Sequence, residues 1–164
     1  MAKSKLAAVV VALLVAGCGS SAPPKTQTLP ASGAPPHQRV PAQAAVLSVS
    51  RGFPGRKPSL IVSTTQAELG KLATIAAMLD QLHPARKGLV SCPNIPVTSR
   101  ITFTFRSRPS GAPLARASMP DTGPRGECPG IEFEASGHPQ RVLYARPAFL
   151  RDAGRVLGVT LLSK

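Results

Sequence analysis

The feature that most constrains the fold is a strict alternation of apolar and polar residues in the second half of the chain. Residues 100–106 read Arg-Ile-Thr-Phe-Thr-Phe-Arg. Successive side chains of a strand point to opposite faces, so one side of this segment carries Ile101, Phe103 and Phe105. The other side carries threonine and arginine. The pattern predicts a β-strand with one face in a core and one face toward solvent.

The same alternation returns twice further along the chain. Residues 114–119 follow a Pro-Ser-Gly turn (109–111) and are suited to pair with the first strand as a hairpin. Residues 131–135 form a third strand, and the segment 121–126 before it is rich in turn formers and is expected to be a loop. The inward positions of these two strands are Ala115, Ala117, Met119, Ile131, Phe133 and Ala135.

Two glutamates, Glu132 and Glu134, occupy outward positions of the third strand. A pair of carboxylates suggests the chemistry of a glycosidase. Successive outward positions of one strand are explained more simply as a solvated face that pairs with arginines of a neighbouring strand. The chain also contains no Gly-x-Ser-x-Gly elbow, no phosphate-binding glycine loop and no His-Glu-x-x-His motif. We therefore assign no catalytic residue.

The clearest helix signal lies before these strands. Residues 65–68 (Thr-Gln-Ala-Glu) fit a capping box, and Pro84 is expected to end the helix. Gly70 costs such a helix about 1 kcal/mol, so its stability must come from packing against a sheet. Apolar residues recur at intervals of three and four: Leu69, Leu72, Ile75, Ala76, Leu79 and Leu82.

Shorter signals complete the pattern. Segments 46–49, 60–62 and 142–144 are expected to be short strands. Pro147 suits the first turn of a closing helix that stops at Gly158. Its apolar side carries Phe149, Leu150, Ala153 and Leu157. Together these elements predict an α+β domain, with a small antiparallel sheet and two helices packed on one face.

The N-terminus has the pattern of an export signal. Lys3 and Lys5 precede an apolar run at residues 6–15, and small residues follow at Ala16 and Gly17. A membrane-spanning helix is the competing interpretation. Ten apolar residues at about 1.5 Å each cover about 15 Å, roughly half of the hydrocarbon core. The segment is too short to span.

The end of this signal resembles the lipobox of bacterial lipoproteins, because residues 15–18 read Val-Ala-Gly-Cys. The resemblance implies that Cys18 is acylated and becomes the first residue of the mature chain; a plain secretory signal followed by a chance cysteine is the alternative. We expect a signal peptide at 1–17, a lipidated cysteine with a Pro/Ser/Ala-rich disordered linker at 18–45, and an extracytoplasmic α+β domain at 46–164.

The strong positive charge limits the partners. The net charge of +13 becomes +11 when Lys3 and Lys5 leave with the signal. Basic residues are spread along the chain and aromatic residues are few, which argues against a nucleic-acid groove. For an exported chain, an anionic membrane or an anionic wall polymer is the expected neighbour, and a solvated basic surface without a ligand is the plainer explanation.

The cysteine count agrees with this location. If Cys18 carries lipid, Cys92 and Cys128 remain as a pair that is expected to oxidise outside the cytoplasm. The bridge encloses 35 residues (93–127) and contributes about 4 kcal/mol. Its two loops lie at one end of the sheet if the three alternating strands form a meander. The histidines, at 37, 83 and 138, are scattered, so no metal and no cofactor is expected.

As a whole, the chain resembles the small secreted lipoproteins of high-GC Gram-positive, actinobacterial cells. The resemblance rests on the lipobox, Cys92-Pro93, the strand at 101–105, Cys128 and the closing helix. The chain departs from that pattern in its Pro-Ser-Gly turn and in Glu127, where such proteins often have glycine. The family has no settled activity, so the resemblance adds no catalytic residue.

Two function classes follow from these observations. The first is a non-enzymatic domain, anchored at the outer face of the cell membrane, that binds a protein, a peptide or an anionic envelope component. The second is an exported inhibitor or a minor hydrolytic enzyme with a site assembled from loops. A deep pocket with convergent polar groups would favour the enzyme, and a flat or basic sheet face would favour binding.

The predicted bridge has a direct test. The purified, non-reduced domain is expected to show no free thiol at Cys92 or Cys128, because the two sulfurs are joined. A thiol-reactive dye in denaturant measures this, with a reduced sample as the control. Two reactive thiols in the non-reduced sample would refute the bridge.

Overall fold

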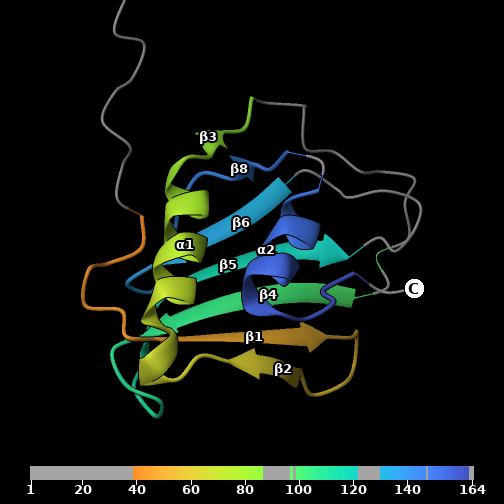
Figure 1. The fold of residues 1–164 in the computed structure, drawn as a ribbon. Helices are drawn as coiled ribbons and strands as arrows, with labels where there is room; N and C mark the ends of the chain where they lie inside the picture. Colours follow the sequence, from red (N-terminus) through yellow and green to blue (C-terminus); the bar gives the residue numbers. More distant parts are fainter. Residues whose placement is uncertain (1–38, 87–96, 98, 122–129, 147, 163–164) are drawn as a thin grey trace, which may run out of the picture. The chain divides into compact units, whose positions relative to one another are not determined.

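The computed structural model describes residues 39–86, 97, 99–121, 130–146 and 148–162. Within them, the strands pair in the order β2-β1-β4-β5-β6-β8-β3, all antiparallel, and β7 pairs with β6 beside this path (Figure 1). The strands are β1 Val46–Gly52, β2 Ser59–Ser63, β3 His83–Pro84, β4 Ser99–Arg106, β5 Pro113–Asp121, β6 Gly130–Ala135, β7 His138–Pro139 and β8 Leu143–Tyr144. The helices are the 3-10 turn η1 Gln66–Glu68, α1 Leu69–Asp80 and α2 Phe149–Leu157.

The predicted α+β fold class is confirmed. Figure 1 shows α1 and α2 over the same face of the sheet. The inward positions predicted for β4 and β5 are all buried, and Ile101, Phe103 and Phe105 are at most 1% exposed. Phe103 meets Phe149 of α2 edge to face, with ring centroids 6.1 Å apart. Sheet and helices therefore share one core, which lies on one side of the sheet only.

The predicted capping box is present. It begins the 3-10 turn η1, which leads directly into α1. The Thr65 backbone amide donates to Glu68 Oε2 at 3.1 Å, and Lys71 Nζ donates to Glu68 Oε1 at 2.6 Å. The bond from Lys71, and then the bond from Thr65, hold the pKa of Glu68 below its ordinary value of 4.5. The Glu68 carboxylate therefore stabilises the folded state at pH values above 4.5. This stabilisation is lost as the pH falls through the lowered pKa of Glu68.

One member of the predicted apolar face of α1 is not in the core. Leu72, Ile75 and Leu79 are buried, whereas Leu69 is 37% exposed. At 3.6 residues per turn, Leu69 lies about 90° round the helix from the line through the other three. The predicted apolar face of the helix was therefore wrong to include Leu69, its first member.

Arg39, seven residues before the predicted boundary at 46, contacts the C-terminal end of α1. The Arg39 guanidinium donates to the carbonyl oxygens of Leu79, Asp80 and Leu82 at 3.1, 2.6 and 2.7 Å. The Asp80 carboxylate accepts from the Arg39 amide at 2.7 Å. Arg39 therefore caps the last carbonyl groups of α1. The helix ends at Asp80, before Pro84.

All three cysteines, Cys18, Cys92 and Cys128, lie outside the described residues. The meander that the bridge requires is present, because β4, β5 and β6 are consecutive antiparallel neighbours. Ser99 pairs with Asp121 in register, and Ser118 pairs with Glu132. The first residues of β4 and β6 therefore lie at the same end of the sheet.

The close of α2 depends on two glycines. Gly158 has a φ of 75°, a left-handed conformation that ends the helix as predicted. The Val159 amide then donates to the Gly154 carbonyl at 2.9 Å. This hydrogen bond holds Val159 against the helix. A Cβ on Gly154 would lie only 2.6 Å from the Val159 carbonyl oxygen. Gly154 is therefore required by close backbone approach.

We expect the same substitution to have opposite effects in the two helices. A Cβ on Gly70 meets no atom within 4 Å, so Gly70→Ala should stabilise the domain by about 0.5–1 kcal/mol. Gly154→Ala should destabilise it by about 1–3 kcal/mol, because the Val159 carbonyl must move. Urea unfolding of both variants measures this. Equal stability of Gly154→Ala and the parent protein would contradict the close approach.

Candidate functional site

The candidate site is the face of the sheet opposite α1 and α2, which we call the outer face. Two rows of polar side chains run across it, because each residue lies opposite the next in the strand register. One row is Ser50, Thr102, Ser118 and Glu132, and the other is Ser48, Thr104, Arg116 and Glu134. The two rows cross β1, β4, β5 and β6. Their residues on β1 and β4 carry hydroxyl groups, and their residues on β5 and β6 are charged except for Ser118.

Each glutamate of the outer face is paired with an arginine. Arg100 holds Glu132 through two hydrogen bonds of 2.7 Å, one to each carboxylate oxygen. Arg116 lies 3.8 Å from Glu134 on the adjacent strand. The prediction that these glutamates form a solvated face paired with arginines is confirmed. Because both pairs are exposed, each contributes at most about 1 kcal/mol to stability.

The hydroxyl groups join the same network. Arg100 Nη1 donates to Ser118 Oγ at 3.3 Å, and the Ser118 and Thr102 hydroxyls lie 3.2 Å apart. Arg106 Nη1 donates to Ser48 Oγ at 2.6 Å. Arg106 has no carboxylate partner within the described part of the chain. The outer face thus carries more positive than negative charge.

A shallow hollow lies over these rows. It measures about 500 Å³ and is open to solvent. Pro58 and Pro139 lie at its two sides, and its remaining lining is mostly the polar residues just described. The volume falls in the range of small-ligand sites, but its lining is more polar than usual. Such a surface suits a ligand that offers hydroxyl and anionic groups.

A second polar cluster lies on the core side of the sheet. Asp121 is fully buried, accepts from Ser99 Oγ at 3.1 Å and lies 3.6 Å from Arg51 Nη2. That nitrogen also donates to the Leu161 carbonyl at 2.6 Å. The cluster ties the ends of β1, β4 and β5 to the C-terminal segment. We expected Asp121 in a loop; instead it ends β5, and it faces inward because it continues the alternation of Ala117 and Met119.

The two histidines that the structure describes lie apart from both clusters. His83 and His138 begin the two-residue strands β3 and β7 and are exposed. Across the described ranges, no group of three or more His, Cys, Asp or Glu residues is placed to hold a metal ion. The same ranges contain no helix long and apolar enough to cross a membrane.

Comparisons with protein-family models, curated proteins and solved structures find no match to this chain. The function is therefore argued from the surfaces of the molecule itself.

Proposed function

We propose that this protein is a lipid-anchored, extracytoplasmic binding domain without enzymatic activity. Its outer face would bind an anionic, hydroxyl-bearing polymer of the cell envelope. The observation that carries the proposal is the array of serine, threonine and arginine side chains across four adjacent strands of the uncovered sheet face.

The chemistry of the outer face matches such a polymer. An arginine guanidinium presents parallel donors that fit the oxygens of a phosphate or carboxylate. Arg106 and Arg116 both lie on this face, and among the described residues the Arg106 side chain bonds only to the Ser48 hydroxyl. The serine and threonine hydroxyls both donate and accept, as sugar hydroxyls require. The overall positive charge adds long-range attraction for a polyanion.

The glutamates support binding rather than hydrolysis. A glycosidase acid needs a raised pKa, which comes from burial. The Glu132 side chain is instead 61% exposed and held by Arg100 in two charged hydrogen bonds. These bonds fix the position of the carboxylate, which suits an orienting role.

The anchor is argued from the sequence. The positive start, the apolar run at 6–15 and the Cys18 that follows them fit acylation by the lipoprotein pathway. Two acyl chains hold a protein stably at a bilayer. A Pro/Ser/Ala-rich linker after Cys18 then leaves the domain free to reach a wall polymer. The proposed Cys92–Cys128 bridge also suits this oxidising location.

The polymer proposal is tested with cell-wall sacculi that carry their anionic polymers. We expect Arg106→Gln with Arg116→Gln to weaken binding at least tenfold, because both removed charges lie on the outer face. The matched control is Arg151→Gln with Arg155→Gln on α2. Each double variant removes one arginine that lies near a carboxylate, which is Arg116 in the first and Arg155 in the second. It also removes one arginine that forms no ion pair among the described residues. Co-sedimentation measures the affinity.

Equal losses in the two double variants would show that overall charge, not the outer face, drives binding. Sacculi stripped of their anionic polymers serve as a second control, and the parent protein should bind them weakly. Undiminished binding to stripped sacculi would refute an anionic ligand.

The anchor is tested by Cys18→Ala. The parent protein should appear in the membrane fraction with an acylated N-terminal cysteine, identified by mass spectrometry. The variant should be released to the medium, because no thiol remains to take the lipid. A cytosolic chain of the parent that still begins at Met1 would overturn the proposal.

A further inference from the structure

A second basic surface lies where the chain joins the domain, and we call it the junction surface. It comprises Arg39, His83, Arg86, Arg141, Tyr144 and Arg146. Arg39 is the first described residue, and its guanidinium reaches the carbonyl oxygen of Leu82 at 2.7 Å. Arg39 therefore lies at the C-terminal end of α1, directly before β3.

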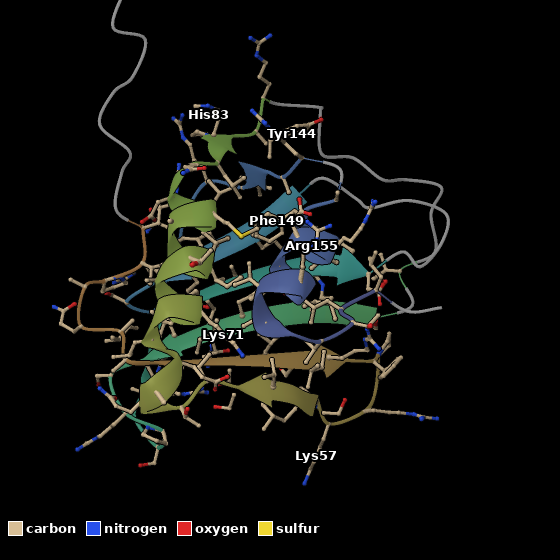
Figure 2. The ribbon with its side chains drawn as sticks, in the orientation of Figure 1. Lys57, Lys71, His83, Tyr144, Phe149 and Arg155 are labelled. Carbon is tan, nitrogen blue, oxygen red and sulfur yellow. The ribbon has the colours of Figure 1, made fainter. Side chains whose placement is uncertain are left out.

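The pairing of β3 with β8 brings the other residues together. His83 pairs with Tyr144 in register, and both lie at the top of Figure 2. The Ala85 amide donates to the Val142 carbonyl at 2.8 Å, so the pairing continues past the strands. Continuing this register by one more position would place Arg86 opposite Arg141.

Two hollows carry the other arginines of this surface. Arg141 lines one hollow of about 480 Å³ together with Arg39 and Pro84. Arg146 lines another of about 260 Å³ with Gln81 and Leu82, which follow the end of α1. Arg39, Arg141 and Arg146 therefore lie near the segment between α1 and β3, and Arg86 comes shortly after β3 in the sequence.

The charge of this surface is not compensated by nearby carboxylates. Arg86, Arg141 and Arg146 are exposed and form no ion pair in the portion of the chain that the structure describes. Asp80 accepts from the Arg39 amide, and Asp152, which shares the hollow of Arg146, lies 3.5 Å from Arg155. The nearest acidic groups are thus already engaged.

We propose that the junction surface docks on the anionic phospholipid headgroups of the membrane that anchors the chain. Guanidinium groups bind phosphate through paired donors, and basic residues near an anionic bilayer each gain about 1 kcal/mol. Tyr144 is 38% exposed between them, and a tyrosine ring suits the boundary of water and lipid. This surface includes Arg39, the described residue nearest in the sequence to the proposed anchor at Cys18.

The docking has a consequence for the proposed polymer site. The junction surface lies at the β8–β3 edge of the sheet, so a docked domain would leave the outer face uncovered by lipid. The inference uses the membrane location from the proposed function, but it involves different residues and does not depend on polymer binding.

The test measures binding of the full chain to vesicles, with Cys18→Ala in every sample so that acylation adds no affinity. Vesicles of phosphatidylglycerol mixed with phosphatidylcholine should bind the protein, and vesicles of phosphatidylcholine alone should bind it weakly. Arg86→Gln with Arg141→Gln and Arg146→Gln should weaken binding to the anionic vesicles by about a hundredfold, from about 1 kcal/mol for each arginine.

The matched control replaces Arg56, Lys57 and Arg108 by glutamine. Like the three arginines of the junction variant, these residues are exposed and form no ion pair among the described residues. Their replacement removes the same charge. They lie in the β1–β2 and β4–β5 turns, and Figure 2 shows Lys57 at the bottom of the view, away from His83 and Tyr144. The control should lose less than tenfold.

Equal losses in the two triple variants would overturn the proposal, since net charge alone would then explain the binding. Absence of binding to the anionic vesicles would also overturn it. Thermal unfolding checks that both variants fold, and salt gives a second measure, because 0.5 M NaCl should release the parent protein from the vesicles. The junction variant should still bind wall sacculi, so failure of this inference is distinguishable from failure of the proposed function.

Discussion

The apolar faces of β1, β4, β5 and β6 pack against α1 and α2, and Phe103 contacts Phe149 edge to face within this core. A fully buried apolar side chain of this size contributes about 1.5–3 kcal/mol. Several such residues together outweigh the cost of Gly70 in α1, and they hold Leu150 and Leu79 without exposure to water. Every other feature of the domain is arranged around this one-sided burial.

One-sided burial leaves the opposite face of the sheet to water, and the residues there show it. Thr102 combines a branched side chain that suits a strand with a hydroxyl that suits solvent. Arg100 spans from β4 across β5 to Glu132 on β6, so the charged groups are held in place by bonds across strands. This polar surface is the site of the proposed polymer binding.

The charges of the domain fall into two groups with different physical roles. Every carboxylate that the structure describes lies against a basic residue, as Glu68 does with Lys71 and Asp121 with Arg51. Those basic residues bond to neighbours within the domain, although Arg116 also faces the proposed polymer site. The positive excess is carried by arginines such as Arg86 and Arg141, which face solvent. In the proposed function, these exposed arginines supply much of the attraction for anionic partners.

Sequence periodicity by itself determined most of the residues that enter the core, because a strand alternates and a helix repeats at 3.6 residues wherever it lies in the fold. It correctly placed Phe105, Leu150 and the solvent-facing Glu132. Only the tertiary structure decided which distant residues meet. The contacts of Arg39 with the end of α1, of Arg51 with Asp121 and of β3 with β8 join segments far apart in the chain. Local pattern carries no information about such contacts, since they form only when the sheet brings its strands together.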